Sequence, residues 1–130
     1  MGHSITWLIE GCVIYAQYYG VVDLAEYAEG GKIFSEMVES GNAPVHILVD
    51  ALRVTKGPHD IPKMLDYMRG YQSPGLGWVL TVTPNKVERF FASLVMQMLN
   101  SNMRMHMFAS MDEVPAYLSE RDPRLESEQI

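Results

Sequence analysis

The chain has 130 residues, of which 48% are hydrophobic and 20% charged, and it carries a formal net charge of −6 with a pI of about 5.1. These values fit one ordinary globular domain with a core of its own. The acidic balance and the lack of a basic stripe argue against nucleic-acid binding. A single cysteine, Cys12, excludes an internal disulfide and favours a reducing, cytoplasmic setting. We expect neither a signal peptide nor a membrane span, because no apolar run approaches the roughly 18 residues that would cross a bilayer.

The first third of the chain predicts a β-hairpin and a helix. Alternating apolar residues over 5–9 and β-branched and aromatic residues over 12–19 are typical of two strands, and the short break between them permits only antiparallel pairing. Asp23 is expected to cap a helix that ends at Gly41. Gly31 lies on the apolar stripe of this helix, which predicts a close approach of its backbone to the sheet.

The stretch VHILVD at 45–50 predicts a short buried strand that ends in the carboxylate of Asp50. A polar loop is expected to follow over 51–58. In α/β sheets, ligands and partners meet the chain at the carboxyl ends of the strands. This loop is therefore the first place to look for a functional site.

The second half of the chain predicts alternating helices and strands. A helix is expected to begin near Ile61, with Asp60 as its cap and Pro62 in its first turn. A buried strand follows over 78–82, and a third helix over 86–99. The residues expected to face the core from this third helix are Val87, Phe90, Phe91, Leu94, Val95 and Met98.

Three features are expected towards the C-terminal end. Methionines alternate with other residues over 103–108, which indicates an edge strand. The capping-box spacing at 110–113 opens a last helix, in which Pro115 lies rather deep and costs a backbone hydrogen bond. We expect one domain over residues 1–120, with residues 121–130 as a flexible acidic tail.

The predicted order of elements is β-β-α-β-α-β-α-β-α. Strands separated by helices pair in parallel through right-handed crossovers, whereas the first strand pairs antiparallel with the second. The predicted fold class is therefore α/β, a small mixed sheet with an N-terminal β-hairpin followed by β-α units.

This pattern resembles the STAS domains, and within them the SpoIIAA-like group related to anti-sigma-factor antagonists. The resemblance covers roughly residues 5–120 and implies a binding or regulatory domain without catalytic activity. It rests on three stretches: the strand at 45–50 with the loop behind it, LGWVLTV at 76–82 followed by Asn85 and Phe90-Phe91, and FASMDE at 108–113 leading to Tyr117-Leu118.

In the antagonist family, a serine in the loop after this strand is phosphorylated, usually near an Asp-Ser-Ser-Gly run. The corresponding loop here, DALRVTKG at 50–57, has no serine, and Arg53 or a neighbour takes that position. We therefore predict a domain without the usual phosphoacceptor. Thr55 is the only hydroxyl nearby, and a phosphate on it would add nearly two negative charges beside Arg53 and Lys56. The alternative is that Thr55 is an ordinary loop residue.

No constellation of residues predicts an enzyme, a cofactor or a metal site. The four histidines are scattered and lack the spacing that places two imidazoles on one helix face. Cys12 lies inside a strand with no histidine beside it and is expected to be a small buried hydrophobe. For Asp50 three roles stay open: bracing its own loop, coordinating a metal, or accepting a partner's hydrogen bond.

Ten methionines are the most unusual feature of the composition. Methionine fills irregular core space and also suits adaptable apolar surfaces. Met64 and Met68 on the second helix, with Met103 and Met105 on the last strand, are the candidate wall of a pocket for a hydrophobic ligand. Core packing is the alternative for the same residues.

We therefore predict a bacterial-type, cytoplasmic regulatory domain that acts through protein–protein interaction, with a regulator, a kinase or a second copy of itself as a homodimer partner. The alternative is a carrier or sensor of a small hydrophobic or lipid-like molecule. The residues expected to form the protein-contact surface are Asp50, Arg53, Thr55, Lys56, Asn85 and Ser110.

Overall fold

The computed structural model describes residues 2–70, 73–99 and 103–126. The predicted order of strands and helices is confirmed. The elements are β1 (Gly2–Ile9), β2 (Val13–Val21), α1 (Leu24–Ser40), β3 (Val45–Lys56), α2 (Ile61–Gly70), β4 (Leu76–Val82), α3 (Lys86–Leu99), β5 (Arg104–Phe108), α4 (Val114–Arg121) and the short 3₁₀ helix η1 (Pro123–Leu125).

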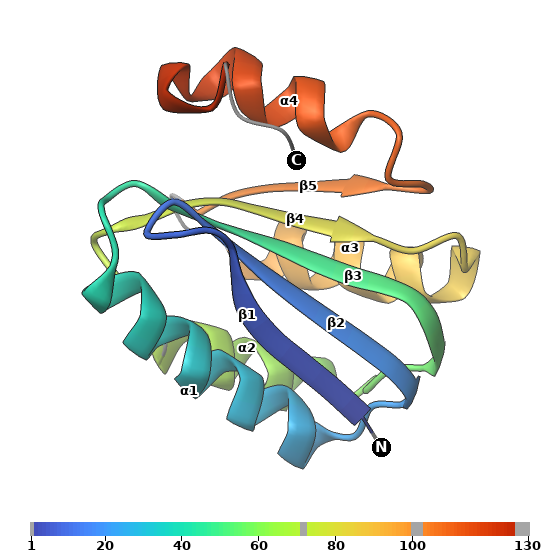
Figure 1. The fold of residues 1–130 in the computed structure, drawn as a ribbon. Helices are drawn as coiled ribbons and strands as arrows, with labels where there is room; N and C mark the ends of the chain where they lie inside the picture. Colours follow the sequence, from blue (N-terminus) through green and yellow to red (C-terminus); the bar gives the residue numbers. More distant parts are fainter. Residues whose placement is uncertain (1, 71–72, 100–102, 127–130) are drawn as a thin grey trace.

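The strands form one five-stranded sheet in the order β1-β2-β3-β4-β5. β1 pairs antiparallel with β2 and every later pair is parallel, so the predicted mixed sheet is confirmed. β5 lies at an edge of the sheet, as predicted. Figure 1 shows α1, α2 and α3 on one face of the sheet and α4 on the other.

Side chains that alternate along the strands divide the core into two sides. Leu48 and Leu80 point to the side of α4, where they pack with Val114, Leu118 and Leu125. The buried apolar residues on the side of α1, α2 and α3 are Ile14, Ala16, Tyr18, Val22, Val38, Val45, Ile47, Met64, Leu65, Val95 and Leu99.

β3 has 12 residues and continues to Lys56, so the loop predicted over 51–58 is wrong up to that residue. Its second half pairs with the end of β2, where Tyr19 lies opposite Arg53. The pairing register shifts after Asp50, and this irregularity interrupts the period-two pattern of the strand. The sequence alone therefore suggested that the strand ended there.

The last helix begins later than predicted. α4 starts at Val114, and Glu113, which precedes it, makes no side-chain capping hydrogen bond, so the capping box at 110–113 is wrong. Pro115 consequently falls within the first two positions of the helix. A missing N–H has no intrahelical partner to lose there, so the predicted cost of Pro115 is also wrong.

The expected boundary after residue 120 does not hold for residues 121–126. Asp122 and Leu125 are both buried, and Leu125 packs into the core beneath α4. This segment therefore belongs to the domain and is not a separate tail. The rest of the predicted tail, 127–130, lies outside the described residues.

The exposed side of α3 differs from the predicted apolar stripe. Val87, Phe90 and Met98 are 57%, 60% and 53% exposed, whereas Val95 and Leu99 are buried. The sequence alone could not show which side of α3 faces the core, because this helix carries apolar residues on both its inner and its outer side.

Candidate ligand-binding cavity

An apolar cavity of about 260 Å³ lies between the sheet and the helices α1, α2 and α3. Val49 of β3 and Thr81 of β4 are paired in register and form part of its floor. Phe34 of α1, Tyr67 of α2 and Val95 of α3 contribute to the walls. The volume lies just below the roughly 300–1,000 Å³ of ordinary small-molecule sites, which favours a small occupant.

The four methionines that the sequence suggested as a pocket wall all line this cavity. Met64 and Met68 come from α2, while Met105 comes from β5 and Met103 from the residue before it. Unbranched thioether side chains change rotamer at low cost and adjust to the shape of an apolar group. The wall is therefore both apolar and adaptable.

Two tyrosines line the β2 side of the cavity. Tyr18 ends the buried part of β2, and Tyr27 lies in the first turns of α1. Burial, followed by the carboxylates of Glu26 and Glu29, raises the pKa of Tyr18 to about 12. Burial also raises the pKa of Tyr27. Both phenols therefore stay neutral at physiological pH and remain hydrogen-bond donors.

Tyr18 reaches its position because α1 has a glycine where the ring meets the helix. A Cβ atom on Gly30 would lie 2.0 Å from the Tyr18 hydroxyl oxygen. A close approach to the sheet thus occurs at Gly30, and Gly31, where it was predicted, lines the cavity. Strand β2 and helix α1 depend on this pair for their spacing.

A carboxylate closes the α3 side of the cavity. Glu88 accepts a hydrogen bond from the Gly57 N–H at 2.5 Å and lies 2.8 Å from the His59 Nε2 nitrogen. The His59 ring stacks on Phe91, with ring centroids 3.9 Å apart. These contacts tie the connection between β3 and α2 to the start of α3. Both oxygens of Glu88 are within hydrogen-bond distance of the His59 nitrogen.

Asp50 is buried and used within the chain. Its carboxylate accepts hydrogen bonds from the Tyr15 hydroxyl and, at 3.1 Å, from the Leu52 N–H. Burial, and then the contact with Asp50, raises the pKa of Tyr15 to about 12. Of the roles left open by the sequence, bracing its own segment of backbone is the one these contacts support.

The other predicted contact residues lie at different levels of the sheet. Asp50 is level with Val82 of β4, which is level with Phe108 of β5, but β3 runs on for six more residues. The paired strand β2 covers this stretch with four residues, from Gln17 opposite Asp50 to Val21 opposite Lys56. At about 3.3 Å per residue, the exposed Lys56 therefore lies roughly 13 Å beyond that level. Arg53 and Thr55, also exposed, lie on the same extension.

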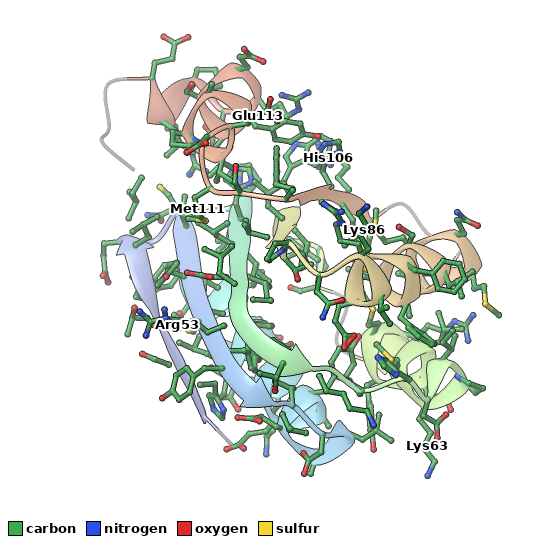
Figure 2. The ribbon with its side chains drawn as sticks, turned by 90° about the vertical axis from the view of Figure 1, so that its right-hand side faces the viewer. Arg53, Lys63, Lys86, His106, Met111 and Glu113 are labelled. Atoms are coloured by element: carbon green, nitrogen blue, oxygen red, sulfur yellow. The ribbon has the colours of Figure 1, made fainter. Side chains whose placement is uncertain are left out.

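Asn85 and Ser110 stay near the ends of β4 and β5. Asn85 is occupied as the cap of α3, because its Oδ1 accepts hydrogen bonds from the backbone N–H groups of Val87 and Glu88. Ser110 is exposed in the turn after β5. Figure 2 shows Met111, the residue after Ser110, beside α4 and well apart from Arg53.

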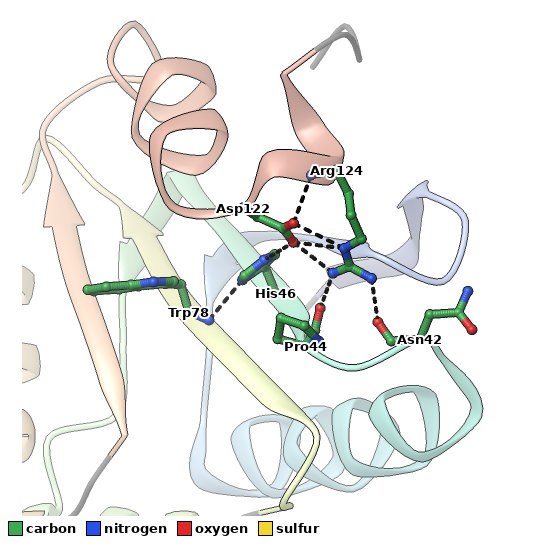
Figure 3. A network of polar contacts seen from close by, with 6 residues as sticks. All are labelled: Asn42, Pro44, His46, Trp78, Asp122 and Arg124. Atoms are coloured by element: carbon green, nitrogen blue, oxygen red, sulfur yellow. Dashed lines mark hydrogen bonds and ion pairs between the residues drawn. The ribbon is translucent and has the colours of Figure 1, made fainter.

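A buried polar network lies on the opposite face of the sheet, between β3 and the C-terminal segment (Figure 3). His46 Nε2 lies 2.8 Å from the Asp122 carboxylate, and His46 Nδ1 accepts the Trp78 N–H at 3.0 Å. Arg124 binds the same carboxylate and donates to the carbonyl oxygens of Asn42 and Pro44. The sequence analysis missed this network, since its members are far apart in the chain.

This His–Asp pair is not a catalytic dyad. The Trp78 N–H occupies Nδ1, so Nε2 carries the ring proton and donates it to Asp122. Burial lowers the pKa of His46 and outweighs the opposing influence of Asp122. A neutral, fully bonded and buried imidazole has no free nitrogen to activate a nucleophile.

Among residues 2–70, 73–99 and 103–126, no group of three or more His, Cys, Asp and Glu side chains is placed to hold a metal ion. In the same ranges, none of the helices combines the length and the apolar character that a bilayer crossing requires.

Comparison with known proteins gives the class of fold. No protein-family model and no curated protein matches the chain. The anti-sigma factor antagonist SpoIIAA in its unphosphorylated form is similar, with a TM-score of 0.59 and 9% identity over 91% of this chain and 97% of that one. The Bacillus cell fate determinant SpoIIAA in its phosphorylated form gives a TM-score of 0.56 and 13% identity over 90% and 99%.

The fold is therefore that of the STAS domains. More narrowly, it is the SpoIIAA-like arrangement with an N-terminal hairpin, as the sequence resemblance implied.

Proposed function

We propose that this chain is a non-catalytic, STAS-like binding domain that carries or senses a small apolar molecule in the cavity between the sheet and α1, α2 and α3. The observation that supports this most directly is the cavity itself, which combines an apolar, methionine-bearing wall with a few polar side chains, among them the neutral phenols of Tyr18 and Tyr27. Apolar pockets with a few polar groups are typical of small-molecule sites. The fold similarity to a family of regulators favours a sensor over a catalyst.

A homologous series of alcohols tests this proposal. Each buried methylene contributes roughly 0.8 kcal/mol, so affinity is expected to rise about fourfold per carbon from hexan-1-ol upwards, and to level off when the cavity is full. The affinity of each alcohol is measured by its displacement of the neutral fluorophore N-phenyl-1-naphthylamine. Lack of binding across the whole series would contradict the proposal.

A matched pair of variants locates the site. Ala92 lines the cavity from α3, whereas Ala116 is exposed on α4 at the opposite face. Ala92→Phe is expected to fill the cavity and weaken alcohol binding at least about tenfold, and Ala116→Phe is expected to leave it unchanged. Circular dichroism of both variants checks that the fold is retained. Equal binding by the two variants would place the ligand elsewhere.

A second candidate function is the capture of a regulatory protein or kinase through the end of β3. The observations that favour it are the likeness to SpoIIAA and the exposed side chains of Arg53, Thr55 and Lys56 on one extended strand. Arg53→Ala/Lys56→Ala is expected to weaken partner capture, and Lys63→Ala/Arg69→Ala on α2 is the control with the same charge change. Intact mass measurement shows whether Thr55 is phosphorylated. Capture that is equal in both double variants would exclude this surface.

Self-association through β1 is a related proposal. β1 lies at the edge of the sheet and contains no Lys, Arg, Asp, Glu or Pro, which are the residues that commonly block pairing with another strand. Sedimentation equilibrium is expected to show a dimer that Thr6→Lys weakens and Gln97→Lys, on the exposed side of α3, does not. A wild-type chain that remains at 14.7 kDa at all concentrations would contradict it.

A further inference from the structure

We infer that the ligand of this cavity is uncharged and carries one hydrogen-bonding oxygen on an apolar body, as in a fatty alcohol, ketone or ester, and that the cavity rejects the matching fatty acid and amine. This inference rests on the proposed function. It follows from the charges around the cavity and from the two hydroxyl groups on its β2 side.

The cavity offers no cation to a carboxylate. Among the described residues that line it, Glu88 is the only charged one, and none is Lys, Arg or His. His59, the nearest histidine on that side, has its Nε2 nitrogen on Glu88 and its ring against Phe91. An ionised ligand carboxylate would therefore be buried without a partner, which costs several kcal/mol in a protein interior.

The β2 side opposes an anion as well. Glu26 and Glu29 lie close enough to Tyr18 for their charge to raise the pKa of its hydroxyl. The same carboxylates repel any negative charge placed beside that hydroxyl. His3 contacts Glu26, at 2.7 Å from Nδ1 to Oε2, but neither residue is part of the cavity wall. Negative groups thus flank the cavity on both its β2 side and its α3 side.

A cation is not favoured either. The Glu88 carboxylate already accepts the Gly57 N–H and lies on the His59 ring nitrogen. An alkylammonium group would lose its hydration on entering the apolar cavity, and the one carboxylate on the wall already shares its charge with these two donors. A neutral head group loses much less hydration free energy and needs no counter-charge.

The two tyrosine hydroxyls explain why one oxygen is expected. Neither Tyr18 nor Tyr27 has a hydrogen-bond partner for its hydroxyl among the described residues, and both stay protonated. A ligand oxygen in the cavity can accept a hydrogen bond from either hydroxyl in place of water. The apolar body then lies along Val49, Val79 and the methionines.

Four ligands of equal chain length test the inference: octan-1-ol, octanoate, octylamine and octane, each titrated at pH 7.5 by displacement of N-phenyl-1-naphthylamine. Octan-1-ol is expected to bind at least about tenfold more tightly than octanoate or octylamine, because each charged head group loses its hydration. If no ligand displaces the probe, the proposed function fails. If octanoate or octylamine binds as well as octan-1-ol, the proposed function stands and this inference is overturned.

The hydroxyl groups are tested separately. The double variant Tyr18→Phe/Tyr27→Phe is expected to weaken octan-1-ol about two- to tenfold and to leave octane unchanged, because only the alcohol loses a hydrogen bond. Tyr15→Phe, which removes a hydroxyl on the other face of the sheet, is the control and is expected to change neither. An equal loss for octane and octan-1-ol would show a packing effect and overturn the role of the hydroxyls.

Discussion

The Nε2 nitrogen of His46 lies 2.8 Å from the Oδ2 oxygen of Asp122, a residue 76 positions further along the chain. The two side chains are only 2% and 4% exposed. This contact joins the central strand β3 to the segment that follows α4. Arg124 completes the site by bonding to Asp122 and to the Pro44 carbonyl at 2.5 Å. The C-terminal segment is therefore held by a buried polar network as well as by Leu125.

Removal of the Asp122 carboxylate is expected to destabilise the domain. Asp122→Ala leaves the His46 N–H and the Arg124 guanidinium without their shared acceptor, and the loss of one partner from a buried network costs roughly 3 kcal/mol. Glu126→Ala removes an exposed carboxylate from the same segment and is the control. Urea unfolding of both variants measures the free energy. A cost for Asp122→Ala as small as that for Glu126→Ala would mean that the network contributes nothing.

The same network makes stability depend on pH. Because burial lowers the pKa of His46, the unfolded chain takes up a proton near pH 6.5 while the folded protein resists it. The stabilisation is thus complete above about pH 6.5 and is lost as the pH falls below that value, with a slope of at most about 1.4 kcal/mol per pH unit. The bonds from Arg124 hold the pKa of Asp122 below its usual range, so its own contribution is lost only below about pH 4.

Unfolding free energies measured between pH 7.5 and 5.5 isolate the contribution of His46 to this pH dependence. The difference in stability between wild type and His46→Asn is expected to shrink as the pH is lowered, because only the wild type must keep a buried imidazole neutral. Asp122 stays ionised over this range and does not contribute to the slope. A difference that stays constant with pH would contradict the assignment.

Features set by residues that are close in the chain, such as helix bounds and caps, were the ones the sequence predicted well. α3 was placed at its observed residues, and the caps Asp23 and Asp60 bond to backbone N–H groups as expected. The second half of β3 was missed because its register shift hides the alternation, and the C-terminal segment was missed because its partners, His46 and Pro44, lie in a distant part of the chain. Local pattern carries no information about such contacts.

In the candidate cavity, too, the sequence predicted what local spacing determines and missed what depends on packing between elements. The methionines that line it were predicted from local spacing. Met64 and Met68 are four residues apart and share one face of a helix, while Met103 and Met105 are two residues apart and share one face of a strand. The hydroxyls of Tyr18 and Tyr27 and the pairing of His59 with Glu88 come from separate elements and depend on how these pack. Only the three-dimensional arrangement brings them to one site.

Gly30 is expected to be intolerant of a side chain despite its place inside a helix. Alanine has a better helix propensity than glycine by about 1 kcal/mol, but a Cβ atom here would meet the Tyr18 hydroxyl at 2.0 Å. Because Tyr18 is buried, we expect Gly30→Ala to cost roughly 1–3 kcal/mol net. Gly70→Ala, where nothing lies within 4 Å, is the control and is expected to be neutral or stabilising. Thermal unfolding distinguishes them, and a stabilised Gly30→Ala would show that Tyr18 moves freely.

Two neighbouring residues of α3 test which side of that helix is buried. The sequence placed Met98 on the core side, whereas the structure exposes it by 53% and buries Leu99. Leu99→Ala is therefore expected to lower the unfolding free energy by roughly 2–5 kcal/mol, because it opens a cavity among Met64, Leu65 and Val95. Met98→Ala removes a side chain of similar size at the next position and is expected to change it by less than about 0.5 kcal/mol. Urea unfolding measures both free energies. If the two variants lost similar amounts of stability, Met98 would be buried and the orientation of α3 would be the one predicted from the sequence.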